Sequence, residues 1–62
     1  MNIRDKVLLV EDERTIRSFM QAILTANGYD VLMAGTGAMA DTMIASHCPD
    51  IIILDLGLPD MD

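Results

Sequence analysis

Two short runs of aliphatic residues, one near each end of the chain, limit the folds that this sequence can adopt. The first run is Lys6–Val10 and the second is Ile51–Leu54, and an acidic residue follows each of them directly. Uninterrupted apolar runs of this length are typical of strands that are buried on both faces of a parallel sheet. A chain of 62 residues can hold only one small domain, so we expect both runs in the same sheet.

The residues between these runs alternate between helical and strand-like patterns. Residues 16–24 and 38–46 predict helices, and residues 29–34 predict a further strand. The first helix would carry its apolar side chains at Ile16, Phe19, Met20, Ile23 and Leu24, and the second at Ala40, Met43 and Ile44. The pair Asn27-Gly28 predicts the end of the first helix. The order is βαβαβ, an α/β fold in which right-handed crossovers join parallel strands.

The composition excludes several classes of protein. Ten acidic residues against four basic ones give a net charge of −6, and no Lys or Arg follows Arg17. Such a surface repels phosphodiester backbones, so we do not expect these residues to bind nucleic acid directly. Cys48 is the one cysteine in the sequence, which excludes an internal disulfide, and we expect a half-buried thiol. We find no membrane span or signal peptide and expect a soluble, intracellular chain.

Acidic residues follow two of the three predicted strands. Glu11 and Asp12 come directly after the first strand, and Asp55 comes directly after the third. The carboxyl ends of parallel strands meet at one edge of the sheet, where open α/β sheets bind their ligands. If the first and third strands are neighbours, three carboxylates converge there, and a hard cation such as Mg²⁺ would offset their repulsion. Most isolated acids at strand ends are solvated loop residues, but a convergent group is a better candidate for a site.

The residues around these acids resemble a known family. Residues 8–13 (LLVEDE) and residues 52–60 (IILDLGLPD) together resemble the receiver domain of bacterial two-component response regulators, and most of all its OmpR/KdpE-type members. The whole chain, residues 1–62, resembles the amino-terminal part of that domain, truncated before the fourth strand. The resemblance implies a CheY-like, flavodoxin-like doubly wound parallel sheet with the strand order 2-1-3.

The resemblance also implies a role for each residue of the acidic site. Asp55 would be the phospho-acceptor, which takes a phosphoryl group from a sensor histidine kinase. Asp12 would bind Mg²⁺ directly, Glu11 would position the ion through water, and the backbone carbonyl of Gly57 would be a further ligand. Such a domain is a cytoplasmic regulatory module and not an enzyme. It controls transcription through a DNA-binding output domain that these 62 residues do not include.

Part of the family pattern has no counterpart in this sequence. The family has a hydroxyl residue after its fourth strand, an aromatic switch residue, and a lysine after its fifth strand. Phosphoryl transfer needs cationic help on the equatorial oxygens, so we expect phosphorylation of Asp55 in this chain to be slow. The order 2-1-3 also leaves Ile51–Leu54 at an open edge. We therefore expect a homodimer with antiparallel edge pairing, in the order 2-1-3-3-1-2, with exchange of the second helical unit as a variant.

Three alternative interpretations remain open. Gly35-Thr36-Gly37 begins a G-x-G-x-x-A pattern that is typical of dinucleotide-binding βαβ units, although this interpretation leaves the acids after the first strand unexplained. Aspartyl phosphatases also use a strand-terminal acid with Mg²⁺, but they need a second acid where Gly57 stands. The chain could also be a self-assembling fragment without a switching function.

Overall fold

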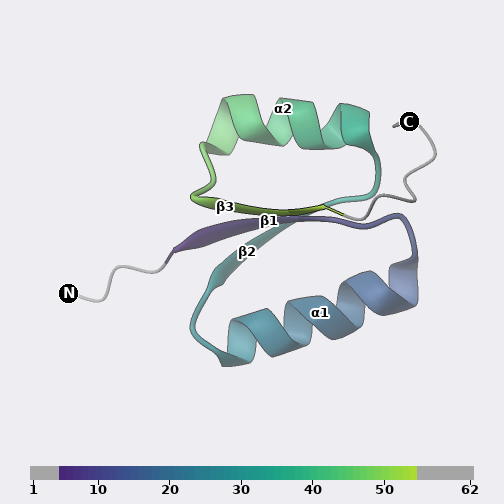
Figure 1. Cartoon of the computed structure of the whole chain (residues 1–62), viewed down its shortest axis with the longest axis vertical. Coiled ribbons are helices and arrows are strands. Elements are labelled where there is room, and N and C mark those ends of the chain that lie inside the picture. Colours follow the sequence, from purple (N-terminus) through teal and green to yellow (C-terminus); the bar gives the residue numbers. More distant parts are fainter. Residues whose placement is uncertain (1–4, 55–62) are drawn as a thin grey trace.

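Residues 5–54 are described by the computed structural model, and they form three strands and two helices (Figure 1). The elements are β1 (Lys6–Val10), α1 (Arg14–Ala26), β2 (Asp30–Ala34), α2 (Gly37–His47) and β3 (Ile51–Leu54). Every element that the sequence predicts is present, and its bounds lie within two residues of the predicted ones. The predicted α/β fold with the order βαβαβ is therefore confirmed.

The three strands form one parallel sheet with β1 at its centre. β2 and β3 flank β1, so the order β2-β1-β3 confirms the predicted 2-1-3 topology. Val10 of β1 is the register partner of both Ala34 in β2 and Leu54 in β3, so the strands end level with one another. The aliphatic run of β1 is at most 1% exposed, as expected of a central strand: Val7, Leu8, Leu9 and Val10.

One helix covers each face of the sheet, α1 on one side and α2 on the other (Figure 1). Below α2 the core consists of Leu8, Val10, Ala34 and Ala40, with Leu32 and Met43 packed against it. Val7 and Leu9 alternate with Leu8 and Val10 along β1 and therefore face α1. The molecule thus has three layers, and β1 is buried between the two helices.

The apolar stripe predicted for α1 is only partly buried. Met20 and Leu24 are half-buried, but Ile16, Phe19 and Ile23 have exposed fractions of 46%, 66% and 46%. Three of the five predicted apolar positions of α1 are therefore exposed. The reason is that α1 packs against β2 and β1, and within residues 5–54 no element contacts its other flank.

β3 lies at the edge of the sheet, with no strand along its outer side among the described residues. Ile51, Ile52 and Leu54 are 40%, 48% and 39% exposed. The predicted open edge is therefore confirmed, whereas burial of β3 on both faces, which so apolar a run predicts, is not observed. At its amino end β3 is joined to β1: the Lys6 N–H donates to Asp50 Oδ2 (2.8 Å), and the Asp50 N–H donates to the Lys6 carbonyl oxygen (2.8 Å).

A residue with left-handed backbone geometry follows the last turn of each helix. Gly28 has a φ of 89° and follows the C-cap residue Asn27, which confirms the predicted role of the Asn-Gly pair. Cys48, the C-cap residue of α2, has a φ of 48°, and its N–H donates to the Ile44 carbonyl oxygen (3.1 Å). The Cys48 side chain is exposed, so the prediction of a half-buried thiol is wrong. The chain leaves the helix at this residue.

Candidate functional site

The candidate site is at the carboxyl edge of the sheet, where β1 and β3 end side by side. Val10 and Leu54, the last residues of these strands, are register partners. Glu11 and Asp12 follow Val10 and lead into α1. Neighbouring strands are about 4.8 Å apart, so groups at two adjacent strand ends can share one small ion.

Glu11 is a buried acid, with only 6% of its surface exposed. Its N–H donates to the Ala34 carbonyl oxygen (3.0 Å), which continues the β1–β2 pairing beyond the last residue of β1. Its Oε1 accepts a hydrogen bond from the N–H of Glu13 (3.0 Å), and its backbone carbonyl oxygen accepts one from Nη1 of Arg17 (2.9 Å). A buried carboxylate requires such partners, because burial without them is costly. Glu11 is therefore held by β2, by its own loop and by α1.

Asp12 and Glu13 differ from Glu11 in their surroundings. Asp12 is exposed at the bend between β1 and α1. Glu13 is the N-cap residue of α1, and its carboxylate accepts hydrogen bonds from the N–H groups of Thr15 (3.2 Å) and Ile16 (3.3 Å). Because Ser, Thr, Asp and Asn are the usual N-cap residues, the sequence does not single out Glu13 for this role. Glu13 thus caps α1, and Glu11 and Asp12 are the candidates for a cation site.

Arg17 and Gly35 also shape this edge, and neither role was predicted from the sequence. Arg17 is half-buried on α1, and its guanidinium reaches back to the Glu11 carbonyl. An ideal Cβ atom on Gly35 would be 3.0 Å from Nη1 of Arg17, so the missing side chain leaves room for the guanidinium. The one signal in the sequence is a basic residue shortly after an acidic run, and that pattern is too common to be specific.

Two residues of the predicted metal site, Glu11 and Asp12, are among those that the structure describes. Mg²⁺ binds one or two carboxylates and keeps several waters, and here a fixed acid, Glu11, stands next to an exposed one, Asp12. The other two predicted site residues, Asp55 and Gly57, lie outside the described residues. Within residues 5–54 no group of three or more His, Cys, Asp or Glu side chains could hold an ion. Of the four predicted residues, the structure thus describes Glu11 and Asp12, which are adjacent in the sequence.

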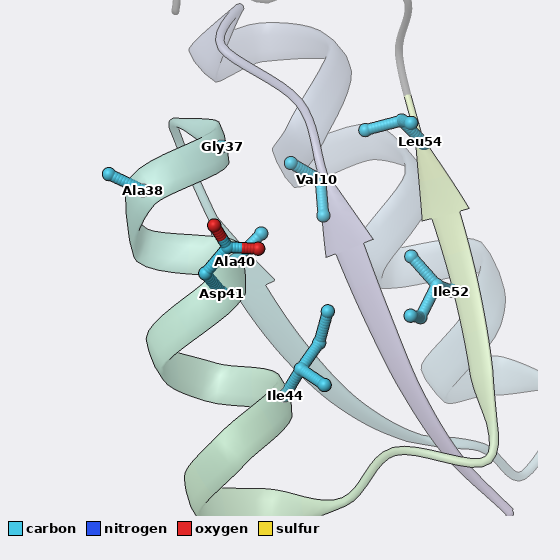
Figure 2. Close-up of a pocket in the computed structure, with 8 residues that line it drawn as sticks. All are labelled: Val10, Gly37, Ala38, Ala40, Asp41, Ile44, Ile52 and Leu54. Carbon is cyan, nitrogen blue, oxygen red and sulfur yellow. The ribbon is translucent and has the colours of Figure 1, made fainter. Parts of the chain in front are cut away.

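A groove lies between α2 and the β1–β3 half of the sheet (Figure 2). Its volume is about 370 Å³, and its lining is mainly apolar: Val10, Gly37, Ala38, Ala40, Asp41, Ile44, Ile52 and Leu54. Figure 2 shows Ile44 of α2 and Ile52 of β3 on opposite sides of this space. Ile44, predicted to face inward, is 39% exposed because it borders the open groove.

The segment Gly35-Thr36-Gly37 connects β2 with α2 and has structural roles. Thr36 is the N-cap residue of α2, and its Oγ1 accepts a hydrogen bond from the Met39 N–H (3.1 Å). A dinucleotide fingerprint follows a strand next to the point where the strand order reverses, whereas β2 is at the edge of the described sheet. The dinucleotide interpretation therefore finds no support in the fold.

The parallel sheet with acidic residues after its central strand is compatible with several α/β families, and comparison with known families identifies which one it is. Residues 7–62 match the family described as the response regulator receiver domain. The chain belongs to this family, whose members are the receiving components of two-component systems. The resemblance that the sequence motifs indicated is thus confirmed.

Two relatives of this chain are OmpR-type response regulators. The transcriptional regulatory protein KdpE of Mycobacterium tuberculosis is 51% identical over 55 residues, which are 89% of this chain and 24% of the relative. The response regulator MprA of Mycobacterium avium is 40% identical over 57 residues, which are 92% of this chain and 25% of the relative. The chain therefore spans about a quarter of the length of these relatives.

A solved structure shares the fold. The signal receiver domain of a Luxo repressor protein from Vibrio parahaemolyticus superposes with a TM-score of 0.88 at 38% sequence identity. The match covers 97% of this chain and 46% of that structure, which confirms the predicted CheY-like fold. Neither of the two described helices is long and apolar enough to cross a bilayer.

Proposed function

We propose that this chain is the phospho-accepting part of a response regulator and that Asp55 receives the phosphoryl group. The alignment of two strand ends carries the proposal. Glu11 and Asp12 follow Val10, and in the sequence Asp55 follows Leu54, the register partner of Val10. Membership of the receiver-domain family and the likeness to KdpE support the same role.

In the proposed reaction a phosphoryl group passes from a histidine nitrogen of a sensor kinase to a carboxylate oxygen of Asp55. The P–N bond breaks, a P–O bond forms, and the nitrogen keeps the electron pair. Catalysis of phosphoryl transfer consists mainly of positioning and charge neutralisation, and a bound Mg²⁺ would supply part of that neutralisation. Asp12, Asp55 and the Gly57 carbonyl would hold the ion. Glu11 would act through water, which agrees with its burial and with its bond to the Glu13 N–H.

The proposal predicts a divalent-cation site that depends on Asp12 and Asp55. In proton-relaxation titrations with Mn²⁺, the 62-residue chain should bind the ion, and Asp12→Asn or Asp55→Asn should abolish binding because each change removes a ligand. Asp30→Asn is the matched control, since Asp30 is an exposed aspartate at the amino edge of the sheet. Equal Mn²⁺ affinities for wild type, Asp12→Asn and Asp55→Asn would contradict the proposal. A nicotinamide nucleotide should not raise the Tm.

The proposed partners are a sensor histidine kinase and, through an output domain outside these residues, DNA. KdpE is a transcriptional regulatory protein by name, and a net charge of −6 does not suit direct contact of this chain with DNA. We propose a regulatory, non-enzymatic role in the cytoplasm, with residues 1–62 as the amino-terminal part of the receiver domain. Slow phosphorylation of the 62-residue chain stays a prediction.

We also propose that the 62-residue chain forms a homodimer through β3. The outer edge of β3 carries backbone N–H and C=O groups with no strand beside them among the described residues, and Ile52 and Leu54 line the open groove. A second copy has the same edge, and a two-fold axis would pair the two β3 strands antiparallel. With Ile53 opposite the partner's Ile53, Ile52 would lie next to the partner's Leu54 on the groove side.

A further inference from the structure

We propose that Arg17 is a positioning residue for the acidic loop, residues 11–13, between β1 and α1. Position 35 is then a glycine because the Arg17 guanidinium occupies the space that a side chain would need there. This inference rests on the proposed cation-binding function. It assigns to residues outside the acidic site the task of holding Glu11 and Asp12 in the geometry that a divalent cation needs.

The first observation is the contact between α1 and the acidic loop. Nη1 of Arg17 donates to the Glu11 carbonyl oxygen (2.9 Å), six residues earlier in the chain. The Arg17 N–H donates to the Glu13 carbonyl oxygen (2.9 Å), so the main chain and side chain of Arg17 both bind the loop. Asp12, the proposed direct ligand, lies between these two attachment points.

The second observation is the fit between Arg17 and Gly35. An ideal Cβ atom on Gly35 would be 3.0 Å from Nη1, closer than a normal contact of about 3.5 Å. A flexible arginine could usually move aside, but here the same nitrogen is held by its hydrogen bond to Glu11. Among the described glycines it is Gly28, not Gly35, that has a positive φ, so the backbone conformation does not require glycine at position 35.

These contacts join three segments that end at the same edge of the sheet. Glu11 bonds to Ala34 in β2, and Arg17 in α1 holds Glu11 from the other side while it lies against Gly35, directly after β2. Ligands that are fixed before an ion binds lose less conformational freedom on binding. Loosening the loop should therefore weaken cation binding even though the fold remains.

The test compares Arg17→Met with Arg14→Met in the 62-residue chain. Both variants remove one positive charge from α1, and Arg14 is exposed in the first turn of the same helix. If charge alone mattered, both variants would bind Mn²⁺ more tightly than wild type, because each has lost a positive charge that repels the ion. If Arg17 positions the loop, Arg17→Met should instead bind Mn²⁺ about fivefold more weakly than wild type. This factor corresponds to the loss of one hydrogen bond. Tighter binding by Arg17→Met than by wild type would overturn the proposal.

Gly35→Ala tests the same contact from the other side. The added methyl group should displace the guanidinium and weaken Mn²⁺ binding by a similar factor. In the Arg17→Met background it should have no further effect, because there is no guanidinium left to displace. An equal loss in both backgrounds would contradict the proposal.

Amide exchange by NMR gives a measurement that needs no metal. The Glu13 N–H, which donates to Glu11 Oε1, should exchange about fivefold faster in Arg17→Met and in Gly35→Ala but not in Arg14→Met. The Asp30 N–H, bonded to the Asp5 carbonyl oxygen at the other end of the sheet, should not change. Equal acceleration of both amides would mean a global loss of stability and would overturn the proposal. If the wild-type chain binds no Mn²⁺, the proposed function fails, and the exchange data still test the contact.

Discussion

At the scale of single residues, Cys48 occupies a backbone conformation that favours glycine. Its φ of 48° brings Cβ close to the following carbonyl oxygen, at a cost of roughly 1–2 kcal/mol for a residue other than glycine. A change to glycine would remove this cost. Glycine also has more conformational freedom in the unfolded chain, and that freedom lowers the stabilisation by roughly 0.5–1 kcal/mol. Cys48→Gly should therefore raise the free energy of unfolding by about 0.5–1 kcal/mol, measured by urea denaturation at one fixed protein concentration.

Cys48→Ala is the control for this change, because it removes the thiol and keeps Cβ. We expect it to leave the free energy of unfolding within about 0.5 kcal/mol of wild type, as for most exposed positions. Equal stabilisation by alanine and glycine would show that the thiol, and not the backbone angle, is the cause.

Residue roles could be predicted from the sequence only where they depend on neighbours along the chain. The Asn27-Gly28 pair announces a helix end, and Gly28 has the expected left-handed conformation. The roles of Arg17 and Gly35 depend on the contact between them, which exists only after α1 and β2 have packed together. No local pattern contains that information.

At the scale of the elements, the hydroxyl group of Thr36 should stabilise α2. It accepts a hydrogen bond from the Met39 N–H at the start of the helix, and loss of such a cap costs about 1 kcal/mol. Thr36→Ala should lower the free energy of unfolding by about that amount in urea denaturation, and Thr36→Ser should restore most of it. Thr42→Ala makes the same substitution inside α2, where the hydroxyl only donates back to the Ala38 carbonyl oxygen. There we expect a neutral or slightly stabilising effect, and equal losses at both positions would contradict the capping role.

Helices and strands follow from the hydrophobic pattern, but the extent of their burial does not. The spacing from Ile16 to Leu24 predicts a helix whatever covers it, and α1 is indeed helical. The other elements decide which flank of that apolar stripe is covered. Phe19 is 66% exposed because, within residues 5–54, α1 contacts β1 and β2 alone. The same reasoning applies to β3: an aliphatic run predicts a strand, but only the strand order decides whether both of its sides are covered.

At the scale of the whole molecule, topology explains why part of the site could be predicted. Parallel strands bring their carboxyl ends to one edge, so the acids after β1 were expected there, and Glu11 and Asp12 are found at that edge. Glu11 is buried, with backbone hydrogen bonds to Ala34 and Arg17, whereas Asp12 is exposed, and this difference could not be read from the sequence. Topology gives the location of a site, whereas packing decides the state of each side chain in it.

The same topology leads to the last prediction, which concerns assembly. A lysine in place of Ile52 would put a charge on the edge of β3 beside which no described strand lies, a change that blocks strand pairing in many proteins. In sedimentation experiments at high micromolar concentration we expect wild type to be a dimer and Ile52→Lys to be a monomer. Ile23→Lys is the matched control, since Ile23 is 46% exposed and Ile52 is 48% exposed, but Ile23 lies on α1. That variant should remain dimeric. A monomeric wild type, or a dimer that Ile23→Lys disrupts and Ile52→Lys does not, would show that β3 is not the interface.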